Sequence, residues 1–143
     1  MKNIMRVIAA MAAAACMLCS CGGSKAETPL DITGEWRLSD VSTKAAVIGE
    51  ENVDVYLSFS GDKKFTMYQM VGQGRYRCFS GTWTLGGNVL NGVYADGTVW
   101  GGSYEVSLSS DKAQLVLVSV GTLRETDTYI RADIPQEVID NAV

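Results

Sequence analysis

Gly34-Glu35-Trp36-Arg37-Leu38 is the first stretch of this 143-residue chain that has the composition of a β-strand. A segment rich in Gly, Ser and Pro precedes it. From Gly34 onward, apolar residues recur with a period of two more often than with the helical period of 3.6. Short clusters of Gly, Asn, Asp and Ser separate the alternating segments, as is typical of turns between strands. The sequence therefore predicts an all-β domain that begins near this stretch.

Eight strands are expected in that domain. The clearest covers residues 53–60, where every second residue from Val53 to Phe59 is apolar. The expected strands cover residues 34–40, 53–60, 65–71, 75–85, 89–94, 98–108, 114–120 and 125–132. Asp96-Gly97 predicts a type I′ hairpin turn, in which both central residues have positive φ. Strands joined by tight turns favour a small antiparallel up-and-down barrel, whose closure removes exposed sheet edges, and a sandwich remains the alternative.

Two segments depart from the strand pattern. Residues 41–52 are longer than a hairpin loop requires, and an apolar helical turn at 45–48 would cover the barrel mouth or belong to an ordinary loop. Residues 133–139 predict a short C-terminal helix with Pro135 in its first turn. Strand 114–120 is apolar on both faces, so its outer face needs a cover. Either a subunit interface or the helix would provide it, the latter through Ile134, Val138 and Ile139.

Charge and cysteine content narrow the function. The chain has 12 basic and 16 acidic residues and no histidine. After residue 20 it keeps ten basic and all sixteen acidic residues, a formal charge of −6. This excludes the basic stripe that nucleic-acid binding needs, and it disfavours electrostatic attraction to anionic membranes. Only Cys78 lies in the body, where we expect a small buried hydrophobe rather than a disulfide partner.

The N-terminal residues have the pattern of an export signal. Residues 1–6 are basic, and residues 7–18 form an apolar segment too short to span a bilayer. Leu18-Cys19-Ser20-Cys21 follows and resembles the lipobox of bacterial lipoproteins. The resemblance implies cleavage before Cys21, a diacylglycerol on its sulfur and a membrane-anchored protein of the cell envelope, on the periplasmic or surface side of the outer membrane. Residues 1–20 would be the signal, 21–31 a flexible tether and 32–143 the folded domain. An ordinary secretory signal is the alternative.

The opening strand carries a second resemblance. Gly34-Glu35-Trp36 matches the Gly-x-Trp signature of the first lipocalin strand, and residues 32–38 are similar to the small lipocalin-like domains of Gram-negative lipoproteins. The resemblance covers residues 33–132. It implies that Gly34 and Trp36 belong to the closed end of a barrel, which the Trp36 side chain plugs. Arg131 from the last strand would lie against the indole, a structural contact worth about 0.5 to 2 kcal/mol.

No catalytic arrangement is evident in the sequence. Serines and Cys78 lack a histidine base, so we do not expect an enzyme. No cofactor or metal is expected either, because Asp62, Asp96 and Asp111 occupy turns, where Asp shapes the backbone.

Aromatic residues and methionines provide the candidates for ligand binding. They are Met67, Tyr76, Trp83, Trp100 and Tyr104, with Met70 beside them. An eight-stranded barrel is wide enough to be filled by side chains or to hold one small ligand. Gly92, Gly101 and Gly102 would make room or bend the strands. We slightly favour a filled interior on these counts.

The leading hypothesis is a lipid-anchored, lipocalin-like protein that binds a small apolar ligand without catalysis. The alternative is a solid barrel that docks another envelope protein, as an inhibitor or assembly factor whose partner the sequence does not identify.

Overall fold

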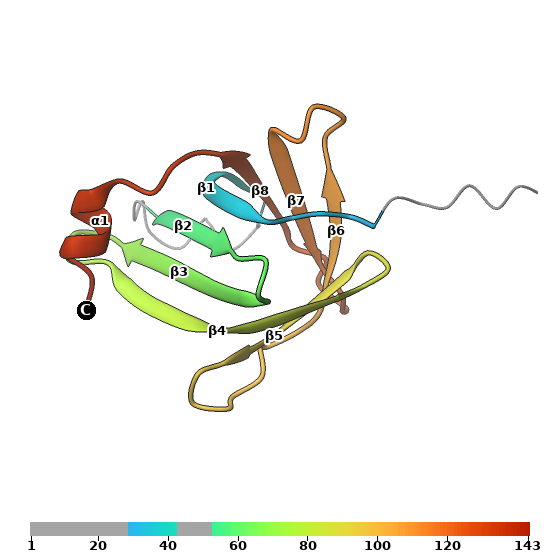
Figure 1. The fold of residues 1–143 in the computed structure, drawn as a ribbon, viewed down its shortest axis with the longest axis horizontal. Coiled ribbons are helices and arrows are strands. Elements are labelled where there is room, and N and C mark those ends of the chain that lie inside the picture. Colours follow the sequence, from blue (N-terminus) through green and yellow to red (C-terminus); the bar gives the residue numbers. More distant parts are fainter. Residues whose placement is uncertain (1–28, 43–52) are drawn as a thin grey trace, which may run out of the picture.

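The computed structural model describes residues 29–42 and 53–143. They form a closed barrel in which each strand pairs antiparallel with its neighbour in sequence, and β8 closes onto β1 (Figure 1). The elements are β1 (Gly34–Ser42), β2 (Val53–Phe59), β3 (Lys64–Val71), β4 (Arg77–Gly86), β5 (Val89–Tyr94), β6 (Tyr104–Leu108), β7 (Gln114–Ser119), β8 (Thr126–Arg131) and α1 (Gln136–Asp140). The predicted up-and-down barrel is confirmed, and the sandwich alternative is wrong.

Several predictions concern residues that the structure does not describe. The signal peptide, the lipidation residue Cys21, most of the tether and the helical turn at 45–48 lie outside the described residues. At the end of the tether, Leu30 already packs against the hydrophobic core. No helix in residues 29–42 or 53–143 is long and apolar enough to cross a bilayer.

The largest difference in strand bounds concerns β6. A strand was expected from residue 98, but β6 begins at Tyr104. The chain before it pairs with β5 only through an isolated bridge between Val93 and Val99, and the Trp100 ring packs against Gly92. Trp100 N donates a hydrogen bond to Gly92 O at 2.9 Å. The turn at Asp96-Gly97 is present, yet only Gly97 has positive φ, so the type I′ prediction is wrong. The Asp96 carboxylate instead accepts a hydrogen bond from Thr98 N at 2.8 Å.

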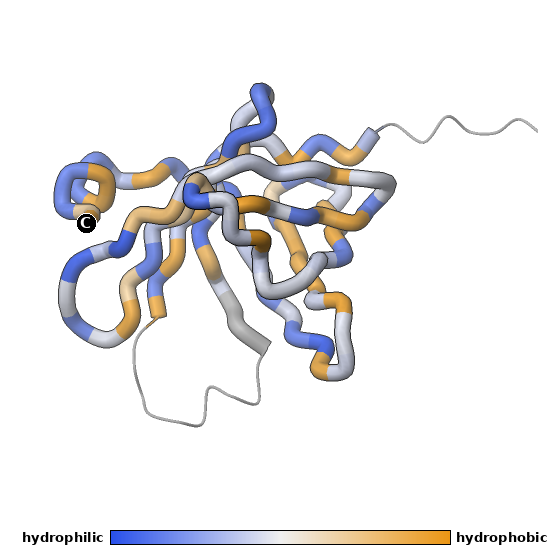
Figure 2. Tube along the Cα trace, turned by 90° about the horizontal axis from the view of Figure 1, so that it is seen from below, coloured by the Kyte–Doolittle hydropathy of each residue, from blue (hydrophilic) through white to orange (hydrophobic). Residues whose placement is uncertain are grey.

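The core occupies the closed end of the barrel, which is the end that holds the β2–β3, β4–β5 and β6–β7 turns. Alternation along each strand sends every second side chain inward, and Figure 2 shows apolar and polar residues alternating along the chain. The largest fully buried side chains are Trp36, Phe59, Phe65, Ile32, Leu90 and Leu115. This end is therefore filled with side chains.

Trp36 and Arg131 face each other where β1 meets β8. The indole Nε1 donates a hydrogen bond to Ile32 O at 3.0 Å, and the guanidinium carbon of Arg131 lies 4.0 Å from the ring centroid. Arg131 Nη1 also donates to Thr33 O at 3.1 Å. At Gly34, φ is +126° and a Cβ would lie 1.9 Å from Arg131 Nη1, so a larger residue would strain the backbone and displace the guanidinium. The contact that the lipocalin resemblance implies is present.

The prediction of what the C-terminal helix covers is wrong. Helix α1 lies beside the end of β3 and the start of β4, on the side of the barrel away from β7 (Figure 1). Its buried residue Val138 lines a surface recess with Tyr56 and Tyr76. The helix starts after Pro135, which caps it rather than entering its first turn.

Backbone hydrogen bonds explain this position. The chain end pairs with the start of β4, where Val143 N donates to Tyr76 O and Cys78 N donates to Val143 O, both at 2.9 Å. Ile134 N donates to Glu35 Oε2 at 2.7 Å, which directs the chain across the outside of β1. The position of the C-terminal tail is therefore explained by backbone groups that need hydrogen-bond partners. The apolar pattern of strand 114–120 does not show where those groups lie.

The prediction that Cys78 is buried is also wrong. Cys78 pairs with Tyr68 across β3 and β4, and both point outward, so the thiol is exposed. Side chains alternate between the two faces of a strand. Trp83 on β4 points inward at an odd-numbered position, so Cys78 at an even-numbered position points outward.

Candidate functional site

A cavity of about 420 Å³ opens at the end of the barrel opposite the core. The ends of β1, β3, β5 and β7 meet there with the starts of the strands that follow them. The residues that line it are Leu38, Val53, Val55, Leu57, Phe65, Met67, Gln69, Tyr94, Trp100, Gly101, Tyr104, Leu117, Glu125, Asp127 and Tyr129. The preference for a filled interior is therefore wrong for this end, because the side chains there line a space instead of filling it.

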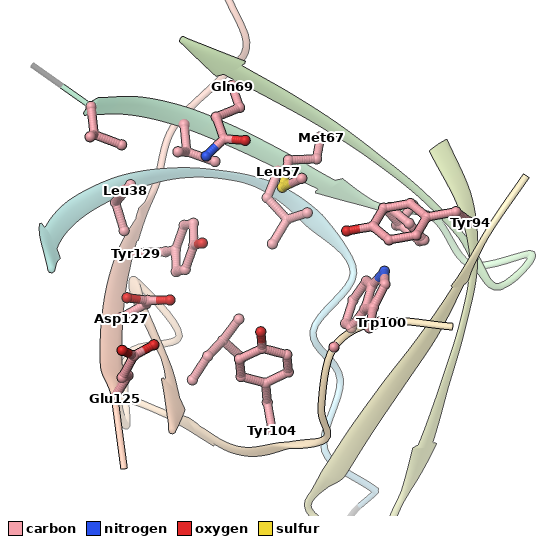
Figure 3. A pocket seen from close by; sticks show the side chains of 15 residues that line it. Leu38, Leu57, Met67, Gln69, Tyr94, Trp100, Tyr104, Glu125, Asp127 and Tyr129 are labelled. Carbon is pink, nitrogen blue, oxygen red and sulfur yellow. The ribbon is translucent and has the colours of Figure 1, made fainter. Parts of the chain in front are cut away.

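The lining has two chemically different sides (Figure 3). On one side, aliphatic side chains project from β2, and Phe65, Met67 and Gln69 project from β3. Aromatic side chains and two carboxylates occupy the other, with Asp127 and Glu125 beside Tyr129 and Tyr104. A pocket that combines apolar walls with convergent polar groups is typical of small-molecule sites.

Three of the five sequence candidates line this cavity, namely Met67, Trp100 and Tyr104. Trp100 packs edge-on against Phe65 at 4.9 Å and against Tyr104 at 6.0 Å between ring centroids. A Cβ at Gly92 would lie 2.1 Å from the Trp100 ring. Gly92 thus makes room for the indole, which in turn forms part of the cavity wall.

Trp83 and Tyr76 do not line the cavity. Trp83 is buried at the closed end, where its Nε1 donates to Lys64 O at 3.1 Å and the Lys63 amine lies 3.9 Å from its ring centroid. It therefore fills space that a ligand would need.

Tyr76 lies outside the barrel wall, beside helix α1. Its hydroxyl donates to Asp54 at 2.7 Å, and Asp54 also pairs with Arg37 at 3.1 Å. In this network on the exterior of the barrel, the polar groups of Tyr76, Asp54 and Arg37 bind one another. Met70 pairs with Asp54 across β2 and β3, so it also faces outward.

Sequence reasoning missed the residues that β8 contributes. Arg131 was placed inward against Trp36, and alternation then sends Tyr129 and Asp127 inward as well. The signal was present in the sequence, but the search for apolar candidates passed over a carboxylate. Tyr94 was likewise missed, at the end of β5.

Asp127 is a partly buried carboxylate in the wall of the cavity. Partial burial raises the pKa of its carboxyl above the ordinary value, and the negative charge of Glu125 raises it further. Burial also raises the pKa values of Tyr104 and Tyr129, with a smaller contribution from Asp127. Both phenols therefore remain neutral hydrogen-bond donors at pH 7.

Comparison with known proteins identifies the fold family. The family described as lipocalin-like domain matches residues 32–115, more than half of the chain. The chain belongs to the lipocalin-like domain family. No curated protein matches the sequence significantly.

Solved structures with a similar barrel include three proteins of low sequence identity. A variant of the fluorescent protein UnaG has 16% identity and a TM-score of 0.45, and the alignment covers 72% of this chain and 97% of the UnaG chain. The REP1-NXSQ fatty acid transporter has 13% identity and a TM-score of 0.40, with 72% and 97% covered. The Schistosoma mansoni fatty acid binding protein in complex with arachidonic acid has 16% identity and a TM-score of 0.38, with 71% and 96% covered.

Within residues 29–42 and 53–143, no three His, Cys, Asp or Glu side chains lie close enough to hold a metal ion. Asp62, Asp96 and Asp111 lie in turns, where each accepts a hydrogen bond from a nearby serine or backbone amide. The cavity can bury an apolar molecule and offer hydrogen bonds to it, which is binding chemistry.

Replacing Asp127 with asparagine should stabilise the protein at neutral pH. Because the pKa of Asp127 is raised in the folded state, its contribution to stability is fully present below the unfolded value of about 3.9 and is lost as the pH rises through the folded value. Asp127→Asn should therefore raise Tm at pH 7 and lose this advantage near pH 3, in thermal unfolding followed by circular dichroism. Asp133→Asn, an exposed control, should not change Tm. A lower Tm for Asp127→Asn at pH 7 would contradict the argument.

Proposed function

We propose that this protein binds a small apolar molecule in the cavity of its barrel, while lipid on Cys21 holds the barrel at a membrane of the cell envelope. The cavity carries the first part of the proposal. It has about 420 Å³ of space, lies within the size range of ligand sites and is walled on one side by aliphatic residues. Burial of an apolar ligand contributes about 25 cal/mol per Å² removed from water.

The sequence carries the second part of the proposal. An apolar export segment ends in Leu18-Cys19-Ser20-Cys21, and the thiol of Cys21 would form the thioether to diacylglycerol. Acyl chains contribute about 0.8 kcal/mol for each buried methylene, so several chains anchor a protein stably. Residues 22–31 would then separate the barrel from the membrane surface.

An interaction module is the second candidate, favoured by the outer face of β7 and β8. Helix α1 does not cover it, and Val120 and Ile130 remain 51% and 42% exposed. Val116 and Val118 are only half-buried on the same face. Exposed apolar residues on a barrel wall are compatible with a protein partner.

Mass spectrometry of the full-length chain, isolated from bacterial membranes, tests the proposal. We expect a covalent mass on a chain that begins at Cys21, retained after denaturation, and a non-covalent mass of roughly drug size that is released by denaturation. Isolation in two detergents of different mass separates a natural ligand from a bound detergent. A bare barrel would contradict ligand binding and favour the interaction module, and an unmodified Cys21 would contradict the anchor.

A further inference from the structure

We propose that the ligand of this cavity carries a positively charged nitrogen at one end of its apolar body, and that Asp127, Tyr104 and Tyr129 bind this end. The inference rests on the proposed ligand binding and deepens it, because it names the chemical class of the ligand. The nitrogen would be an alkylated ammonium, and the apolar body would lie against β2 and β3.

The charge of the cavity is the first argument. Asp127 and Glu125 are the charged side chains that line the described cavity, and no lysine or arginine lines it. The ion pairs of the described residues join Arg37 to Asp54, Lys64 to Asp62 and Arg124 to Glu105, all on the exterior. Neither cavity carboxylate is therefore paired within the described part of the chain.

The environment of Asp127 is the second argument. Its carboxyl is partly withdrawn from water, and neither a hydrogen bond nor a positive charge from the described residues lowers its pKa. An ionised carboxylate in such a place lacks the compensation that buried charges ordinarily have. A cationic ligand group would supply that compensation, and a carboxylate ligand would add repulsion to it.

Two tyrosines complete the site beside Asp127. Tyr129 is only 6% exposed, yet no described residue forms a hydrogen bond with its hydroxyl, which points into the cavity (Figure 3). Tyr104 points its hydroxyl into the same space from β6. Aromatic rings attract alkylated ammonium groups through their negative faces. An amphiphile with such a group would find aromatic rings and a carboxylate together.

The nearest candidates for an opposing positive charge do not change this picture. Arg77 pairs with Gln69 across β3 and β4, but its side chain is exposed and does not line the cavity. Arg131 faces inward at the closed end, where it covers Trp36. The described cavity thus lacks the basic side chain that would hold a fatty acid carboxylate.

Three ligands with the same apolar chain test the inference. The full-length chain in zwitterionic lipid nanodiscs is titrated by calorimetry at pH 7 with decyltrimethylammonium, decanol or decanoate, and heats from empty nanodiscs are subtracted. We expect the ammonium to bind about tenfold more tightly than the carboxylate, with the alcohol between them. Asp127→Asn should remove most of this difference, whereas the control Asp133→Asn, which loses the same charge outside the cavity, should preserve it.

The outcomes separate this inference from the proposed function. If decanoate binds as tightly as the ammonium, or if Asp127→Asn leaves the ammonium affinity unchanged, the inference is wrong while apolar binding stands. If none of the three ligands binds, the proposed function fails as well. Thermal unfolding of Asp127→Asn verifies that any loss of affinity occurs in a folded barrel.

Discussion

Replacing Trp36 with alanine should lower the free energy of unfolding by about 3 to 5 kcal/mol, the range for a buried tryptophan or phenylalanine reduced to alanine. The side chain is 0% exposed, and its Nε1 hydrogen bond to Ile32 O would be lost with it. The substitution also removes the ring that lies 4.0 Å from the guanidinium carbon of Arg131, where β1 closes onto β8. Three contributions therefore disappear together at the point of barrel closure.

Chemical denaturation followed by circular dichroism measures this effect. Trp100→Ala is the matched control, because Trp100 is only partly buried and its Nε1 has no hydrogen-bond partner among the described residues. It should lose less stability than Trp36→Ala, since it removes part of the cavity wall rather than part of the packed core. Equal losses would show that the closed end does not dominate the stability of the barrel.

The opening strand and the alternation behind it predicted an eight-stranded all-β domain and favoured a barrel over a sandwich. Each β-strand buries one face, so the pattern from Val53 to Phe59 already determines which side chains point inward. The same rule would have placed Cys78 outside, because it alternates with Trp83 on β4. That error arose from treating cysteine by its average burial instead of by its position in the strand.

The cavity could not be predicted in the same way. Its existence depends on where the large side chains go, and the sequence gives equal weight to Trp83 and Trp100. The structure places Trp83 in the core and Trp100 beside the cavity, because the chain before β6 pairs with β5 only at Val99 and lays the Trp100 ring against Gly92. This path is a tertiary feature with no local signal. The position of α1 is similar, since it depends on backbone partners at the start of β4.

Replacing Met67 with tryptophan should block the cavity and reduce the amount of co-purified ligand by about tenfold or more, a change of about 1.4 kcal/mol in binding free energy. Met67 lies on β3 and points into the cavity opposite the tyrosines of the other wall (Figure 3). The larger ring would occupy the space that an apolar ligand needs. Because that space is present in the barrel, the cost of overpacking should stay below the usual 1 to 3 kcal/mol.

Met70→Trp is the control for this substitution, because it makes the same change on the same strand but on the outer face, where Met70 pairs with Asp54. Native mass spectrometry should find the ligand on the wild type and on Met70→Trp, and little of it on Met67→Trp. Similar unfolding curves for the two variants would show that the loss arises from blocked space. If Met67→Trp retained its ligand while Met70→Trp lost it, the binding site would lie on the exterior of the barrel beside β3, and the proposal that the cavity binds the ligand would be wrong.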